Sequence, residues 1–81
     1  MNQVKLIPLN VPDIGDADRI LLASWNISPG EKVAQDQELC ELVTDKAAFP
    51  LESPRNGVIK EIMKQEGEEV RVGETLAILE T

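Results

Sequence analysis

Short apolar runs broken by turn residues make up most of the chain. Runs rich in Val, Ile and Leu end at Pro, Gly, Asn or Asp roughly every six to twelve residues, which is typical of a mostly β domain. The main strands are expected at Val4–Leu9, Arg19–Trp25, Leu39–Thr44, Ala47–Glu52, Val58–Met63 and Thr75–Leu79. We also expect two shorter pairing segments, near Lys32–Val33 and Glu69–Val70.

A helix is the main alternative for the segment Arg19–Trp25. The apolar burst there is short, and Ser28, Pro29 and Gly30 follow just beyond it. Pro and Gly close to the end of a short run favour a strand over a helix, because a helix needs a longer periodic pattern.

The chain contains an internal repeat. Residues 30–44 read GEKVAQDQELCELVT and residues 67–81 read GEEVRVGETLAILET, with six of fifteen positions identical at an offset of 37. Upstream, the spacing L-x-x-P-x-x-G occurs at residues 9–15 and again at 51–57, at an offset of 42. The sequence therefore predicts two copies of one four-strand unit. The first copy would hold about five extra residues, for which the acidic stretch 15–18 is the natural place.

Two four-strand units can bury their apolar faces on each other. This predicts an all-β flattened barrel or sandwich of two four-stranded antiparallel sheets, with pseudo-two-fold symmetry, in a single domain at residues 1–81. The axis would place Thr44 and Thr81, where the two copies end, at opposite ends of the domain. Lys46 follows Thr44 in the turn between the copies, so it should project away from the termini, with the enlarged loop at residues 13–18 beside it.

The charge of the chain argues against two kinds of partner. Fifteen acidic residues against eight basic ones give a formal net charge of −7, which disfavours nucleic acid and anionic membrane surfaces. The apolar runs are too short to span a bilayer, and no secretory leader pattern opens the chain. Cys40 is the only cysteine. We expect it to be a buried apolar residue in a reducing intracellular compartment.

The composition also excludes most kinds of catalytic and metal-binding site. The chain has no His and no Tyr, so imidazole bases, His metal ligands and Ser-His or Cys-His pairs are absent. No Gly-rich phosphate loop is present. We therefore expect neither catalytic residues nor a metal site. A turn lysine is ordinarily just solvated, but the place of Lys46 between the two copies favours a site that carries a covalent adduct.

The ordered motifs of the chain resemble the lipoyl domains of 2-oxo acid dehydrogenase complexes, in the biotinyl/lipoyl attachment family. The family's P-D-I-G-E, G-D-x-V and E-x-E-[TS]-D-K-A segments are similar to VPDIGD (11–16), SPGEKV (28–33) and ELVTDKA (41–47). The second half matches through NGVIKEI (56–62) and EGEEVRVGETLAIL (66–79), so the resemblance covers about residues 4–80. Val43 departs from the family's acid, and residues 16–18 depart from its commoner Glu-Gly. Both departures leave open which complex is served.

The resemblance implies a non-catalytic carrier domain of a dihydrolipoamide acyltransferase, with lipoic acid in amide linkage on Lys46 between Asp45 and Ala47. A lipoate ligase or octanoyltransferase would attach it. The arm would be reductively acylated by a thiamine-dependent decarboxylase, pass the acyl group to coenzyme A at an acyltransferase core, and be reoxidised by dihydrolipoamide dehydrogenase. The bacterial cytoplasm or the mitochondrial matrix is the implied location. The residues expected to guide partner recognition are Asp13, Ile14, Gly15, Asp16, Ala17, Asp18 and Thr44.

Two other functions fit a domain of this type. Biotinyl domains of biotin-dependent carboxylases also modify a hairpin lysine, but theirs is typically flanked by methionines, whereas Asp45 and Ala47 flank Lys46 here. The glycine-cleavage carrier is longer than these 81 residues. From a different class, the chain could be an unmodified β-sandwich that serves only as an interaction module. It ends on a predicted strand without a linker, so we expect it to be a domain excised from a longer subunit.

Overall fold

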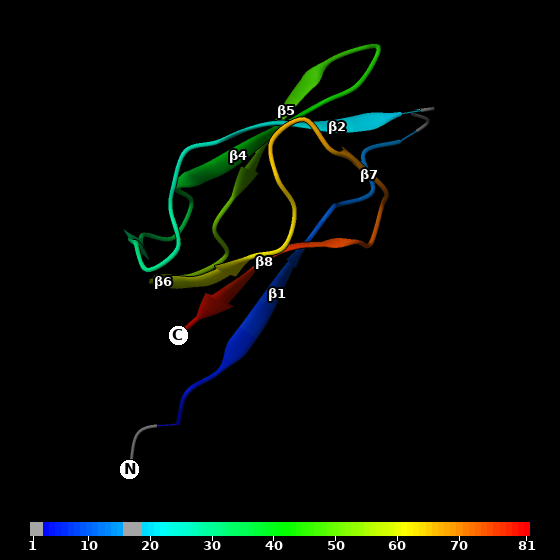
Figure 1. Cartoon of the computed structure of the whole chain (residues 1–81). Helices are drawn as coiled ribbons and strands as arrows, with labels where there is room; N and C mark the ends of the chain where they lie inside the picture. Colours follow the sequence, from blue (N-terminus) through cyan, green and yellow to red (C-terminus); the bar gives the residue numbers. More distant parts are fainter. Residues whose placement is uncertain (1–2, 16–18) are drawn as a thin grey trace.

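The computed structural model describes residues 3–15 and 19–81, which fold into strands and turns (Figure 1). All eight predicted segments are strands, and the segment that a helix could have occupied is strand β2. The strands are β1 (Leu6–Asn10), β2 (Ile20–Trp25), β3 (Lys32–Val33), β4 (Glu38–Val43), β5 (Ala48–Glu52), β6 (Gly57–Ile62), β7 (Glu69–Val70) and β8 (Thr75–Glu80). None of the described residues belongs to a helix that could span a membrane.

The strands form two four-stranded antiparallel sheets. One has the order β1-β8-β6-β3 and the other β5-β4-β2-β7. No strand pairing among the described residues joins one sheet to the other, so the fold is a sandwich whose sheets do not close into a barrel. Strands β1 and β5 are both edges, and each carries a proline, Pro8 or Pro50. Proline lacks a backbone donor and is compatible with an edge strand, where it also hinders pairing with another chain.

The structure confirms the repeat at the level of single strands. A shift of four in the strand numbers, with β1 following β8, converts the order of one sheet into that of the other. Strand β5 begins 42 residues after β1, at 48 against 6, while β6, β7 and β8 begin 37 residues after β2, β3 and β4. The connection from β1 to β2 has nine residues (11–19), and its counterpart from β5 to β6 has four (53–56). The five extra residues therefore lie in the β1–β2 connection, as predicted.

The core consists of two matched clusters of buried residues. The first holds Leu9, Ile27, Val33, Leu39, Ile59, Ala77 and Leu79, and the second holds Val11, Ile20, Leu22, Cys40, Leu42, Val70 and Leu76. Trp25 and Leu51 pack against both clusters and so connect them. Since the core residues are almost all aliphatic, their burial supplies most of the force that holds the two sheets together.

Cys40 is buried, as the sequence predicted. Desolvation, with a smaller effect of the Glu38 carboxylate, raises the pKa of the Cys40 thiol to about 12. The thiolate is the reactive form of cysteine, so near neutral pH this side chain behaves as a small apolar residue of the core.

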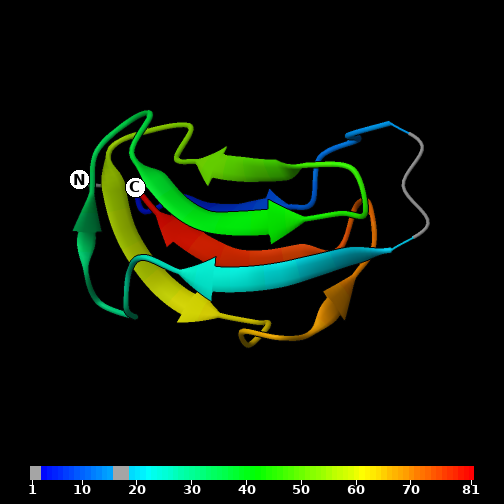
Figure 2. The same cartoon turned by 90° about the horizontal axis from the view of Figure 1, so that it is seen from above.

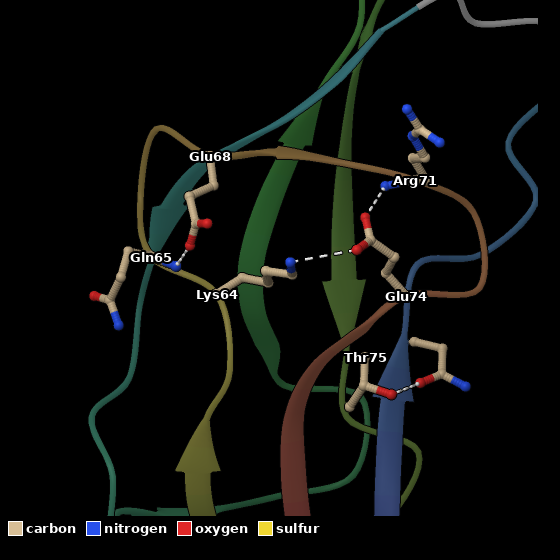
Figure 3. A network of polar contacts seen from close by, with 7 residues as sticks. Lys64, Gln65, Glu68, Arg71, Glu74 and Thr75 are labelled. Atoms are coloured by element: carbon tan, nitrogen blue, oxygen red, sulfur yellow. Dashed lines mark hydrogen bonds and ion pairs between the residues drawn. The ribbon is translucent and has the colours of Figure 1, made fainter.

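Four connections between strands share one turn design. Each contains a four-residue turn in which the side-chain oxygen of the fourth residue accepts a hydrogen bond from the backbone N–H of the first. The pairs are Glu31 with Ser28, Gln37 with Ala34, Glu68 with Gln65 and Glu74 with Arg71. The third position has a positive φ in every case, at Gly30, Asp36, Gly67 and Gly73. Figure 3 shows two of these contacts together with the ion pair between Lys64 and Glu74, whose N–O distance is 3.3 Å.

Candidate modification site

Lys46 is exposed in the turn that joins β4 to β5. Only Asp45 and Lys46 separate Thr44 from Ala47, and the Thr44 N–H donates to the Ala47 carbonyl at 2.8 Å. Thr44 and Ala47 are thus the last paired residues of the hairpin, next to the turn. The side chain of Lys46 therefore starts from the tip of a short, backbone-bonded hairpin, with the exposed residues Asp45 and Ala47 on either side.

The Lys46 turn lies at the opposite end of the domain from the termini (Figure 2). Under the pseudo-symmetry, Thr44 and Ala47 correspond to Thr81 and Lys5, and that pair is also bonded, with the Thr81 N–H donating to the Lys5 carbonyl at 2.9 Å. One end of the sandwich is thus closed by the Lys46 turn, while the equivalent place at the other end holds the two ends of the chain. The predicted direction of the turn is confirmed.

The hydroxyl of Thr44 is bonded within the turn. Its Oγ1 accepts from the backbone N–H of Lys46 at 3.1 Å and from that of Ala47 at 3.2 Å. It also donates to the Ala47 carbonyl oxygen at 3.3 Å. The sequence predicts a part in partner recognition for Thr44, and this role stays a prediction. Its polar atom has a structural task that sequence reasoning missed.

The β1–β2 connection is described up to Gly15 and again from Arg19; the predicted recognition residues Asp16, Ala17 and Asp18 lie outside the described residues. Asp13 Oδ1 accepts from the Gly15 N–H at 3.1 Å, a local turn that the positive φ of Gly15 accommodates. Ile14 is half-buried against the second core cluster. Of the three described residues, the aspartate and the glycine are therefore the exposed ones.

Both described flanks of this connection lie at the Lys46 end of the sandwich (Figure 2). The register agrees, because Leu21 near the start of β2 pairs with Val43 at the end of β4. The shorter β5–β6 connection lies with the termini. A Cβ added to Gly57 would come within 2.5 Å of the Glu80 carbonyl oxygen and 3.2 Å of the Thr81 side chain. The geometry thus agrees with the predicted placement of the longer connection for the residues that the structure describes.

A shallow open depression lies away from the Lys46 turn. It is lined by Trp25, Ile27, Ser28, Pro29, Ile62, Gln65 and Glu66. Two of its polar groups are engaged with backbone: Trp25 Nε1 donates to the Lys64 carbonyl at 2.9 Å, and Glu66 accepts from the Trp25 N–H at 2.7 Å. Across residues 3–15 and 19–81, no group of three or more His, Cys, Asp or Glu side chains could hold a metal ion. The Lys46 turn therefore remains the candidate site that both the sequence and the fold indicate.

The chain is similar to known proteins along almost its whole length. A family model described as biotin-requiring enzyme, which covers biotin and lipoyl domains, matches residues 7–79. Among solved structures, the lipoyl domain of the 2-oxoglutarate dehydrogenase complex from Azotobacter vinelandii is 34% identical, with a TM-score of 0.76. That alignment covers 90% of this chain and 94% of the solved one.

Two curated relatives come from Cupriavidus necator. The dihydrolipoyllysine-residue acetyltransferase component of its pyruvate dehydrogenase complex is 35% identical over 74 residues, 91% of this chain and 13% of the relative. The succinyltransferase component of its 2-oxoglutarate dehydrogenase complex is 32% identical over 77 residues, 94% of this chain and 18% of the relative. This chain therefore spans less than a fifth of the length of either relative.

Proposed function

Since this chain belongs to the biotin- and lipoyl-attachment family and is a lipoyl domain of the type found in 2-oxo acid dehydrogenase acyltransferases, we propose that Lys46 bears a lipoyl group. The observation that carries the proposal is the position of Lys46. It is an exposed residue at the tip of a two-residue turn, at the end of the domain opposite the termini. An enzyme can reach its side chain there without opening the fold.

The attachment chemistry fits an exposed amine. The Lys46 ammonium loses one proton, and its Nζ attacks the carboxyl carbon of lipoate that has been activated as an anhydride with AMP. AMP leaves, a second proton is released, and an amide bond remains. The amide is uncharged, so the formal net charge of the chain goes from −7 to one unit more negative. The arm itself then carries no charge that would oppose its entry into a partner's active site.

The architecture suits a carrier that visits several enzymes. A lipoyl group bound to Lys46 would carry acyl groups and reducing equivalents between the active sites of a 2-oxo acid dehydrogenase complex. Lys46 lies at the end away from Lys5 and Thr81, so a tether at either terminus would leave the lysine end of the domain facing a partner. Tethering raises the effective concentration of the lysine at each site.

The partners in this proposal are a lipoate ligase or octanoyltransferase, a thiamine-dependent 2-oxo acid decarboxylase, an acyltransferase core and dihydrolipoamide dehydrogenase. The bacterial cytoplasm or the mitochondrial matrix is the proposed location. We assign recognition by the decarboxylase to the β1–β2 connection at residues 13–18, whose described flanks are at the Lys46 end. A longer loop on a rigid scaffold is a common place for recognition.

Biotin is the second candidate, because the matching family model covers both cofactors. The exposed neighbours Asp45 and Ala47 differ from the methionines typical of biotinyl domains, which favours lipoate. The test is to incubate the chain with ATP and either lipoate plus a lipoate ligase or biotin plus a biotin ligase, and to compare intact masses. We expect the mass of one lipoyl group in the first reaction and little change in the second. Preferential biotinylation would reverse the assignment, and no modification in either reaction would favour an unmodified interaction module.

A further inference from the structure

The two central residues of the Lys46 turn are poorly suited to a tight hairpin. Two-residue hairpin loops favour turns with positive φ at one or both central positions, usually supplied by Gly or Asn. Asp45 and Lys46 occupy these positions here, and Asp36 is the only described residue other than glycine with a positive φ. The backbone of the Lys46 turn therefore matches the twist of β4 and β5 less well than the favoured turns do, and it needs support from elsewhere.

Thr44 supplies that support from its side chain. Oγ1 accepts from the N–H groups of Lys46, at 3.1 Å, and of Ala47, at 3.2 Å. The second of these N–H groups is the one that binds the carbonyl of the first residue in an ordinary β-turn. One hydroxyl thus holds the backbone on both sides of the Lys46 Cα, while the Thr44 N–H fixes the outer pair at 2.8 Å. Threonine side chains of this kind stabilise local turns.

We propose that Thr44 is the positioning residue for modification of Lys46. Its hydroxyl fixes the backbone of the turn, and so the direction in which the lysine side chain leaves it. The inference rests on the proposed function, since it assigns a task in attaching the group to Lys46. Without the hydroxyl the turn samples further conformations, and only a fraction of molecules presents the amine correctly. The apparent affinity of the modifying enzyme for the domain falls in proportion to that fraction, while the rate of attachment within the bound complex changes little.

The pseudo-symmetry provides a matched control. Thr81 is the counterpart of Thr44 at the other end of the sandwich, with its N–H bonded to Lys5 as that of Thr44 is to Ala47. The same substitution at Thr81 therefore removes the same atoms from an equivalent strand end, far from the lysine. A general effect on stability should appear in both variants, and a positioning effect should appear in only one.

The experiment compares the steady-state kinetics of lipoate attachment, by a lipoate ligase with ATP and lipoate, on wild type, Thr44→Val, Thr44→Ser and Thr81→Val. All are assayed well below their melting temperatures. We expect Thr44→Val to raise KM for the domain about three- to tenfold, the range of one net hydrogen bond, with kcat nearly unchanged. Thr44→Ser, which keeps the hydroxyl, should restore KM, and Thr81→Val should match wild type.

A second readout does not depend on the enzyme. The amide protons of Lys46 and Ala47 should exchange with solvent faster in Thr44→Val than in wild type, and Thr44→Ser should restore the slower exchange. Thr44→Ala replaces Thr44→Val in both measurements if the valine variant does not fold. Unchanged exchange at both amides, wild-type KM in the variant without the hydroxyl, or failure of serine to restore KM would each overturn the assignment. If wild type itself is not modified while the exchange result holds, the proposed function fails and the structural role of Thr44 stands.

Discussion

Leu21 lies directly across from Val43 in the second sheet, so β2 begins beside the point where β4 enters the Lys46 turn. The nine-residue connection that leads into β2 therefore reaches the same end of the domain as the lysine. The equivalent four-residue connection leads into Gly57, where an added Cβ would meet Glu80 and Thr81 at the other end of the domain. The longer of these two matched connections thus has its described flanks at the end of the sandwich that holds the candidate site.

This placement predicts that the loop contributes to recognition. Replacing residues 16–18 with a short neutral turn should leave folding and lipoylation intact but slow reductive acylation by the cognate decarboxylase. The control is Arg55→Ser, which changes a charge in the shorter connection at the opposite end and should not affect acylation. The measurement is the initial rate of acylation on fully lipoylated domain. An unchanged rate in the loop variant would show that the longer loop has no part in recognition.

The position of the lysine in the turn should matter more than its immediate sequence. In the double variant Asp45→Lys with Lys46→Ala, the amine moves one place along the backbone and leaves the turn in a different direction. We expect lipoylation to slow by about tenfold or more, because a small misplacement of a reacting group is costly. Modification of the shifted lysine at the wild-type rate would contradict the idea that the turn presents one defined direction.

Gly73 and Asp36 occupy equivalent turn positions, with φ values of 89° and 71°. No atom lies within 4 Å of a Cβ added to Gly73, so Gly73→Ala tests backbone strain alone. We expect it to lower the free energy of unfolding by about 1–2 kcal/mol. Asp36→Gly relieves backbone strain but raises the conformational entropy of the unfolded chain. Because these effects oppose each other, it should change the free energy of unfolding by less than about 1 kcal/mol. Denaturant titration measures both, and an equal loss in the two variants would contradict the turn assignment.

The pH dependence of stability should include a contribution from Glu74. The hydrogen bond from the Arg71 N–H, and then the contact with Lys64, lower the pKa of the Glu74 carboxyl from its ordinary value of 4.5. A lowered pKa in the folded state means that the contribution is present above pH 4.5 and is lost as the pH falls through the folded value. Glu74→Gln keeps an acceptor for the turn, as Gln37 does in the matching turn, without the charge.

The stability difference between wild type and Glu74→Gln should therefore be largest above pH 4.5 and shrink as the pH falls through the lowered pKa of Glu74 in the folded state. Lys64→Gln removes only the ion pair and keeps the stronger backbone bond, so most of the pH dependence should persist in it. Thermal unfolding across this range measures the effect. A difference that stays constant with pH would show that the ionised form of Glu74 is not favoured by folding.

Much of the fold could be predicted because the sequence contains two copies of one four-strand unit. The offsets of 37 and 42 read from the sequence are the offsets between the strands of the two copies. They also gave the direction of Lys46, because a two-fold axis that crosses the length of the sandwich places Thr44 and Thr81 at opposite ends. The alternative of a helix for β2 was a matter of local pattern. It was resolved by pairing with β4 and β7, which no local pattern contains.

The features that sequence could not predict depend on contacts between distant or competing groups. The sequence is compatible with both a closed barrel and a sandwich. In the structure the sheets are separate, because β3 and β7, each two residues long, end without pairing to the other sheet in the described part of the chain. The bond of Trp25 to the Lys64 carbonyl joins residues 39 apart. Thr44 matched a family motif, but the same residue could face a partner or the turn. Coordinates were needed to find its hydroxyl bonded to the backbone of Lys46 and Ala47.

The most direct test of Lys46 as the attachment site is to locate the adduct. Wild type and Lys46→Arg are each treated with lipoate, ATP and a lipoate ligase, then digested and sequenced by tandem mass spectrometry. We expect one lipoyl group on wild type, in the peptide containing Lys46, and none on Lys46→Arg. The variant should unfold at nearly the wild-type temperature, because substituting an exposed turn residue has little effect on stability. A lipoyl group on Lys5, Lys32, Lys60 or Lys64, or any lipoyl group on the Lys46→Arg variant, would contradict the central claim.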